Sequence, residues 1–213
     1  MLLLSSILAL LCISAARADC PAALKTLLNA NLESNQVNGC GSDWQYSARP
    51  SGGWCYKVFL GSLSQADSAA QCVAQGAVLS GLQDTTELAF IQAATLAQMT
   101  QASGSVWLGL KRTAACSKIG KTAACTNTTA FAWTDGSATG TAGFVFQDGQ
   151  PDNVSASKDQ DCALLLVANT TTITAGATYY SGQLDDVQCA PTFAAYNQGR
   201  VTRAFVCGKK ASK

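Results

Sequence analysis

Apolar and polar positions follow a helical period in the first half of the chain and a strand-like period in the second. Residues 54–59 alternate around aromatic rings, which predicts a strand. Ser64 and Asp84 each stand before a segment of helical period and predict the starts of two helices. A further short amphipathic helix is predicted within residues 19–39, where four leucines recur at helical spacing: Leu24, Leu27, Leu28 and Leu32.

The two helices after residue 60 carry further signals. Asp67 stands three residues after Ser64, and Glu87 stands three residues after Asp84, as in a capping box. Ala66, Ala69, Ala70 and Val73 line one face of the first helix. The buried face of the second helix is predicted to hold Leu88, Ile91 and Ala94.

After residue 100 the helical period stops, and short apolar runs are separated by Gly, Asn, Asp, Ser and Thr. These runs predict strands joined by long loops, at residues 106–110, 131–133, 163–167 and 204–207. A helical half followed by a strand-and-loop half predicts an α+β fold. The stretch 135–158 is long for a structureless connection, and loops of that length are usually functional or disordered.

The first eighteen residues have the pattern of a signal peptide. Residues 2–13 are apolar, and Ala16-Arg17-Ala18 is a cleavage signature, so a mature chain starting at Asp19 and secretion are expected. The apolar run is too short to span a bilayer, and no later stretch is long enough. The predicted organisation is a signal peptide (1–18), an N-terminal segment (19–39), one domain (40–208) and a tail (209–213).

Composition excludes several functions. The chain has 14 basic and 13 acidic residues, so no basic surplus exists to hold nucleic acid or an anionic membrane. Histidine is absent, which excludes Ser-His and Cys-His nucleophilic machinery and histidine metal sites. The acidic pair Asp185-Asp186 does not predict a glycosidase, because neighbours in a strand point to opposite faces. We therefore expect no enzyme and no catalytic residue.

The cysteines predict disulfides, because the expected compartment is oxidising and no C-x-x-C pair indicates zinc. Cleavage after Ala18 would remove Cys12 and leave nine of the ten cysteines. The odd one is expected to be Cys20, at the mature terminus. It is either a capped or adventitiously paired thiol, or it forms an interchain bond that links a dimer.

Three clusters of acidic and amide side chains fall in the second half of the chain, at residues 150–153, 159–161 and 185–186. All their candidate ligands are oxygen donors, which suit calcium. A cis bond before Pro151 would let Gln150 and Asp152 point into one site. Each cluster alone would be interpreted as a solvated turn, and it is the combination with the flanking cysteines that favours a shared site.

The sequence resembles a C-type lectin-like domain over roughly residues 40–208. The resemblance implies an α+β fold of the long form, with two helices packed on small antiparallel sheets and a long calcium-binding loop region. In order along the chain, the marks are Trp54-Cys55-Tyr56, Cys72, Ala77-Val78-Leu79-Ser80, Glu87, Trp107-Leu108-Gly109-Leu110, residues 131–137, residues 149–153, Asp161-Cys162, residues 185–189 and Phe205-Val206-Cys207.

The resemblance also implies disulfides, which spacing alone could not choose. The implied pairs are Cys40–Cys55, Cys72–Cys207 and Cys162–Cys189. Cys116 and Cys125 remain, and they are close enough along the chain to close a local hairpin.

By position, the resemblance implies a Ca²⁺ site made by Gln150, Asp152, Gln160, Asp185 and Asp186. Three of these, Gln150, Asp152 and Asp185, would also contact the carbohydrate, and Gln-Pro-Asp usually goes with galactose-type sugars. The sequence departs from the family at Gln160, where Glu is usual, and at Leu184-Asp185-Asp186, which replaces Trp-Asn-Asp. Asp159 is an alternative ligand to Gln160. Calcium affinity is expected to be weak, on the order of 10⁻⁴–10⁻³ M.

Three glycosylation sequons begin at Asn127, Asn153 and Asn169. A glycan on Asn153 would sit beside the sugar site and could block it. The leading hypothesis is a secreted, calcium-dependent carbohydrate-binding glycoprotein, with a role in microbe recognition or innate defence inferred from the resemblance alone. The alternative is a calcium-independent scaffold that binds protein, lipid or a crystal surface, and Gln160, Leu184 and the Asn153 sequon favour it.

Overall fold

The structure is a computed structural model that describes residues 22–41 and 43–212. The predicted signal peptide and Cys20 lie outside these residues. The helices are α2 (Ala22–Val37), α3 (Gln65–Ala74) and α4 (Thr85–Gln98), with short 3₁₀ helices η2 (Ala114–Cys116) and η3 (Ala195–Arg200). In this part of the chain, no helix combines the length and apolar character needed to cross a membrane.

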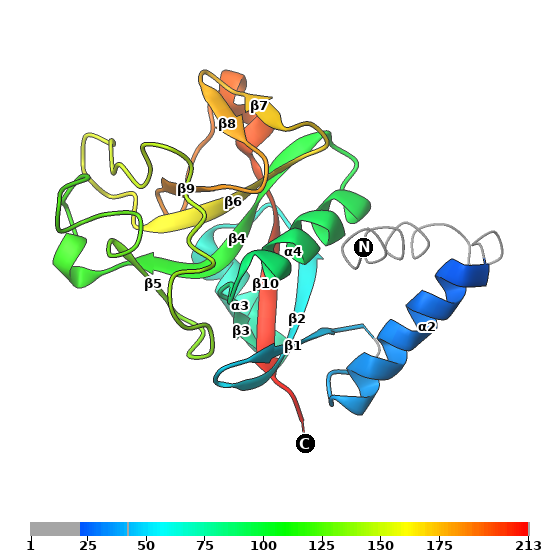
Figure 1. Cartoon of the computed structure of the whole chain (residues 1–213). Coiled ribbons are helices and arrows are strands. Elements are labelled where there is room, and N and C mark those ends of the chain that lie inside the picture. Colours follow the sequence, from blue (N-terminus) through cyan, green and yellow to red (C-terminus); the bar gives the residue numbers. More distant parts are fainter. Residues whose placement is uncertain (1–21, 42, 213) are drawn as a thin grey trace.

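Most strands belong to one sheet, in the order β1-β2-β10-β4-β6-β9, with β3 paired to β10 and β5 paired to β4 (Figure 1). The pairs are antiparallel except β10 with β4, which is parallel. Strands β7 and β8 form a separate two-stranded sheet. The predicted α+β architecture is confirmed. The strand bounds are β1 Gln45–Arg49, β2 Gly52–Leu60, β3 Val78–Leu79, β4 Ser103–Arg112, β5 Phe131–Trp133, β6 Cys162–Ala168, β7 Thr172–Thr174, β8 Thr178–Tyr180, β9 Leu184–Val187 and β10 Thr202–Lys210.

Helix α2 occupies the segment where the leucine spacing predicts a helix. The side chains of Leu24, Leu27, Leu28 and Leu32 lie outside the described residues. In Figure 1 the helix lies to one side of the domain, and the long loop region lies at the opposite side.

Helix α3 begins after Ser64, whose hydroxyl accepts a hydrogen bond from the Asp67 backbone N–H at 3.1 Å. Its buried face differs from the predicted one. Gln65, Ser68 and Cys72 are buried, whereas Val73 is 68% exposed. The disulfide from Cys72 to β10 fixes which side of the helix faces the sheet. This covalent constraint outweighs the helical spacing of Ala66, Ala69, Ala70 and Val73, from which the other face was predicted.

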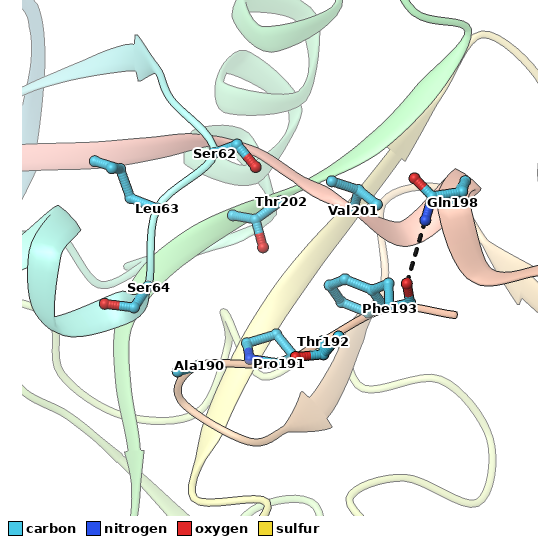
Figure 2. A pocket seen from close by; sticks show the side chains of 10 residues that line it. All are labelled: Ser62, Leu63, Ser64, Ala190, Pro191, Thr192, Phe193, Gln198, Val201 and Thr202. Atoms are coloured by element: carbon cyan, nitrogen blue, oxygen red, sulfur yellow. Dashed lines mark hydrogen bonds between the residues drawn. The ribbon is translucent and has the colours of Figure 1, made fainter. Parts of the chain in front are cut away.

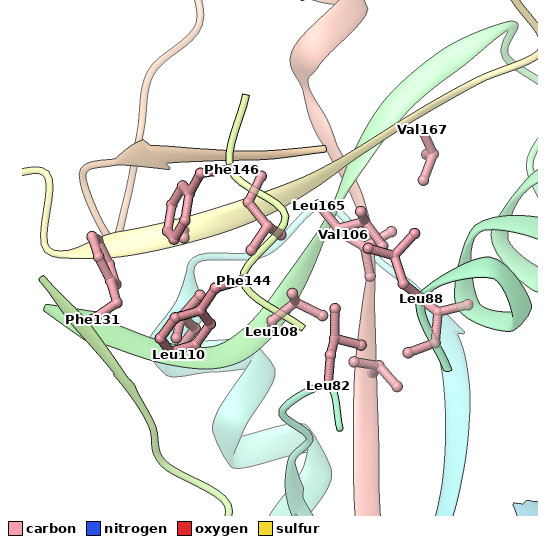
Figure 3. Packing of buried hydrophobic residues seen from close by; sticks show 14 of the residues in the cluster. Leu82, Leu88, Val106, Leu108, Leu110, Phe131, Phe144, Phe146, Leu165 and Val167 are labelled. Carbon is pink, nitrogen blue, oxygen red and sulfur yellow. The ribbon is translucent and has the colours of Figure 1, made fainter. Parts of the chain in front are cut away.

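Helix α4 begins after Asp84, whose carboxylate accepts hydrogen bonds from two backbone N–H groups of the first turn. Its predicted buried face is confirmed. These side chains pack with residues of β4, β6 and the long loop in the main hydrophobic core (Figure 3), whose members include Leu82, Leu88, Val106, Leu108, Phe144, Phe146, Leu165 and Val167.

A buried ion network ties the start of the long loop to the core. The Arg49 guanidinium, at the end of β1, pairs with Glu87 of α4 at 2.7 Å and with Asp135 at 2.8 Å. None of the three side chains is more than 3% exposed. Because separating these buried charges would leave them unpaired and away from water, the network fixes the position of Asp135 at the start of the long loop.

Four disulfides staple the domain: Cys40–Cys55, Cys72–Cys207, Cys116–Cys125 and Cys162–Cys189. The last one joins the start of β6 to the segment just after β9. It holds together two of the three clusters of acidic and amide residues, because one cluster precedes Cys162 and another precedes Cys189.

Candidate functional site

The candidate site lies where the long loop between β5 and β6 returns to β9. The loop contains no named strand, but an isolated bridge pairs Phe146 with Leu184 and brings the loop alongside β9. The Gln150–Pro151 peptide bond is cis. The next two residues, Asp152 and Asn153, donate backbone hydrogen bonds to the carboxylate of Asp186.

The Asp186 carboxylate is the centre of the site. The residue is fully buried. Its Oδ1 accepts a hydrogen bond from the backbone N–H of Asp152 at 3.1 Å, and its Oδ2 accepts one from the backbone N–H of Asn153 at 2.9 Å. Its Oδ2 also accepts a hydrogen bond from the guanidinium of Arg112. The long loop is thus fastened to β9 through one side chain.

Arg112, at the end of β4, supplies the positive charge of this centre. Its side chain is 2% exposed and lies over the ring of Phe131, with 4.7 Å from the guanidinium carbon to the ring centroid. It donates two hydrogen bonds to the Gln160 carbonyl, at 3.0 and 2.9 Å. Burial raises the pKa of Asp186 to about 6, and the Arg112 guanidinium opposes that rise.

Three more of the predicted ligands lie around this centre: Gln150, Asp152 and Gln160. Their side-chain polar atoms form hydrogen bonds with other groups of the protein. The Gln150 Oε1 accepts a hydrogen bond from the Asp152 backbone N–H at 3.0 Å. The Gln160 Oε1 accepts from the Ser155 backbone N–H at 3.2 Å, and its Nε2 donates to the Asp186 carbonyl at 2.9 Å. The loop closes on itself through these amides.

Asp159, the alternative ligand, is partly exposed and accepts a hydrogen bond from the Ser155 hydroxyl at 2.7 Å. That hydrogen bond holds the pKa of the Asp159 carboxyl below its ordinary value. The carboxylate therefore stays ionised at neutral pH and contributes negative charge at the rim of the loop.

The fifth predicted ligand, Asp185, is not part of this group. Successive residues of a strand point to opposite faces, so Asp185 of β9 points away from Asp186. It is 2% exposed and forms an ion pair with Arg200, which also donates a hydrogen bond to the Tyr179 hydroxyl at 2.8 Å. Each carboxylate of the Asp185-Asp186 pair has its own buried arginine.

This arrangement does not fit a calcium ion. A calcium site needs six to eight oxygen ligands directed at one centre. Here the central carboxylate already faces a guanidinium, two amide oxygens accept from the loop backbone, and Asp185 lies on the other face. Across the described residues, no three acidic or cysteine side chains form a group that could hold a metal ion.

Sequence reasoning missed the two arginines that decide this electrostatic balance. Arg112 stands two residues after the predicted strand 106–110, and Arg200 stands four residues before the predicted strand 204–207. The one available signal was general: buried carboxylates need compensating positive charges nearby. It could not select these two arginines, because several other basic residues also stand near strand ends. Their partners are 74 and 15 residues away along the chain, which no local pattern can show.

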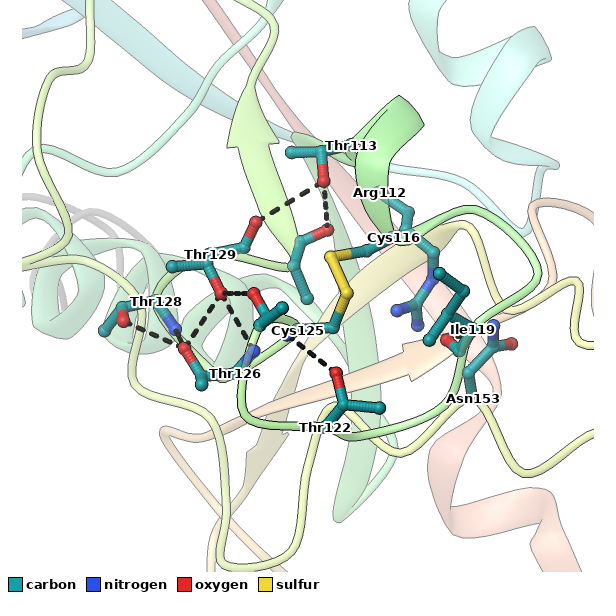
Figure 4. The surroundings of a disulfide bond; sticks show 12 residues. Arg112, Thr113, Cys116, Ile119, Thr122, Cys125, Thr126, Thr128, Thr129 and Asn153 are labelled. Carbon is teal, nitrogen blue, oxygen red and sulfur yellow. Dashed lines mark hydrogen bonds between the residues drawn. A yellow bond between two sulfur atoms is a disulfide. The ribbon is translucent and has the colours of Figure 1, made fainter.

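Asn153 holds the loop in shape from inside. Its side chain is fully buried and lies near Ile119 and the Cys116–Cys125 disulfide (Figure 4). Its Nδ2 donates to the carbonyls of Ile119, at 3.0 Å, and Lys158, at 3.3 Å, and its Oδ1 accepts from the Gln160 backbone N–H at 3.0 Å. A glycan on Nδ2 would break these bonds and would have no room in the folded domain.

We therefore expect glycosylation to differ among the three sequons. In protein secreted from eukaryotic cells, Asn127 and Asn169, which are both exposed, are the expected acceptors, and Asn153 is expected to be unmodified. Peptide mass spectrometry before and after glycan removal in ¹⁸O-water measures the occupancy of each asparagine. A glycan on Asn153 in natively folded protein would contradict this packing.

Comparisons with known proteins agree with this architecture. The family model described as C-type lectin domain-containing protein 141/158 matches residues 47–210. The sequence matches no curated protein. Among solved structures, the C-type lectin CEL-I from Cucumaria echinata is 19% identical with a TM-score of 0.52, over 82% of this chain and 100% of that one. The cow C-type carbohydrate-recognition domain of CD23, solved in the presence of a GlcNAc2Man3 oligosaccharide, is 18% identical with a TM-score of 0.50, over 83% and 99%. At these identities the structural likenesses concern the fold alone.

Proposed function

Because the chain belongs to the C-type lectin domain family, we propose that it is a secreted recognition module that binds its ligand without calcium. Domains of this family are generally non-enzymatic binding modules. The observation that carries the proposal is the buried guanidinium of Arg112, which lies against the Asp186 carboxylate at the centre of the loop site.

The charge balance of the loop supports this proposal. Asp186 and Asp185, two of the three carboxylates in the predicted ligand set, are each paired with a buried arginine. A calcium ion would have to displace Arg112 or approach within a few ångströms of it. Displacing it would leave a buried cation without its partner, which typically costs about 3–5 kcal/mol. With a dissociation constant of about 10⁻⁴–10⁻³ M, even ~10 mM calcium would add only about 1.4–2.7 kcal/mol of net stability, which is less than that cost.

The test is a calcium titration of the unmodified protein, with melting temperature and isothermal calorimetry as readouts. We expect the same melting temperature in ~10 mM calcium and in chelator. If the site instead bound calcium with a dissociation constant of about 10⁻⁴–10⁻³ M, ~10 mM calcium would add about 1.4–2.7 kcal/mol of stability. A shift of that size, with heat of binding near one ion per chain, would overturn the proposal.

A second candidate function is calcium-dependent binding of a galactose-type carbohydrate. It is favoured by the contact between Gln150 and Asp152, and by the partial exposure of the Asp152 and Asp159 carboxylates at the rim of the loop. Glycan-array binding measured in calcium and in chelator separates the two candidates. If galactose-type glycans bind in calcium and do not bind in chelator, the calcium-dependent function is correct.

With either function, we also propose that Cys20 links two chains into a disulfide-bonded dimer.

A further inference from the structure

A cavity of about 410 Å³ lies outside the loop site and shares no residue with it (Figure 2). Three segments meet there: the linker from β2 to α3, the segment after β9, and the junction of η3 with β10. Its volume falls within the range of small-molecule sites, about 300–1,000 Å³. The lining residues are Ser62, Leu63, Ser64, Ala190, Pro191, Thr192, Phe193, Gln198, Val201 and Thr202.

The walls of this cavity are fixed by contacts with the core. The Trp107 indole N–H donates to the Leu63 carbonyl at 2.8 Å. The Gln65 backbone N–H donates to the Cys189 carbonyl at 2.9 Å, and Cys189 is itself held by its disulfide to Cys162. Because the segments are fastened to each other, a ligand would not have to order them on binding.

The lining combines an apolar wall with hydroxyl groups and no charge. The half-buried ring of Phe193 faces the cavity from one side, and the Ser62 and Thr202 hydroxyls point into it from the other (Figure 2). Within the described residues, neither of these hydroxyls forms a hydrogen bond, although Thr202 is only 4% exposed. The Gln198 Nε2 donates to the Phe193 carbonyl at 3.2 Å, which leaves its Oε1 as a free acceptor.

We propose that this cavity binds one uncharged, polyhydroxylated ring, such as a neutral hexose unit. A charged ligand would find no counter-charge in the lining, since none of the ten lining residues is ionisable. The Arg200 guanidinium, 5.7 Å from the Phe193 ring centroid, is already paired with Asp185. A purely apolar ligand would leave the hydroxyl of the nearly buried Thr202 without a hydrogen bond, which is unfavourable in a partly closed site. A sugar ring meets both demands, because its hydroxyls pair with the Thr202 and Ser62 hydroxyls while its C–H face lies on the Phe193 ring.

The test is saturation-transfer NMR with galactose, glucose and N-acetylglucosamine as probes, in chelator so that calcium takes no part. We expect millimolar binding of at least one sugar. Thr202→Val keeps the shape of the side chain and removes its hydroxyl, and should weaken that binding about threefold to tenfold. Phe193→Ala should weaken it about fivefold or more through loss of the ring face.

Tyr196→Ala is the matched control for Phe193→Ala. Tyr196 is an aromatic residue of the adjacent η3, is 68% exposed and does not line the cavity, so its removal should leave sugar binding unchanged. Asp152→Ala, in the loop site, should also leave it unchanged. The proposal is overturned if none of the three sugars binds at ~50 mM, or if binding survives both Thr202→Val and Phe193→Ala. Neither result bears on calcium at the loop, so the two proposals fail independently.

Discussion

Replacing Arg112 by methionine should destabilise the domain by about 3–5 kcal/mol near neutral pH. The substitution keeps an unbranched apolar chain over the Phe131 ring but removes the cation that faces Asp186. The Asp186 carboxylate would then remain buried with only its two backbone hydrogen bonds. Urea denaturation followed by tryptophan fluorescence measures the change in unfolding free energy.

Lys111→Met is the matched control, since it removes the same charge from the neighbouring, exposed residue of β4. It should change stability by no more than about 0.5 kcal/mol. Adding Asp186→Asn to Arg112→Met should recover a large part of the loss, because the buried charge is then gone as well. Equal losses for the Arg112 and Lys111 variants would show that the guanidinium does not stabilise the site.

The pH dependence of this loss follows from the pKa of Asp186. Burial raises that pKa to about 6, above its value in the unfolded chain. The folded state therefore binds the proton more tightly, and this group's contribution to stability falls as pH rises from about 4 to about 6. Without Arg112 the pKa rises further. The deficit of the Arg112 variant should thus be larger near about pH 7 than near about pH 5.

The elements that sequence predicted well are those whose burial follows a local period. The strand at residues 131–133 and the helix after Asp84 lie where predicted, because apolar side chains on one face need no distant partner to explain them. Strand β9 was not among the strands predicted from apolar runs, although the exclusion of a glycosidase already assumed that Asp185 and Asp186 are neighbours in a strand. Its sequence Leu-Asp-Asp-Val looks like a polar turn, and both aspartates are buried only because Arg112 and Arg200 arrive from other parts of the chain.

The candidate site shows the same limit. The resemblance implied five oxygen ligands, and four of them, Gln150, Asp152, Gln160 and Asp186, do lie in one hydrogen-bonded group. What such a group binds depends on the charges beside it. A motif records the acidic and amide side chains and says nothing about an arginine from a different strand, so its chemistry could not be decided from the sequence.

Removing the Cys72–Cys207 disulfide should have a larger effect on stability than removing the Cys116–Cys125 disulfide. The first closes a loop of 135 residues and the second a loop of 9. Because cross-linking restricts the unfolded chain more when the closed loop is longer, the expected losses are about 5 and about 2.5 kcal/mol. Each pair is replaced by two alanines, and the unfolding free energies are compared by urea denaturation.

The comparison is well matched because all four cysteines are nearly fully buried, so the packing lost with each pair is similar. The longer bridge also fastens α3 to β10, and its loss should lower the protection of α3 amides from hydrogen exchange more than that of the β4–β6 pair. If the two double variants lose the same stability, chain entropy does not govern the contribution of these bridges.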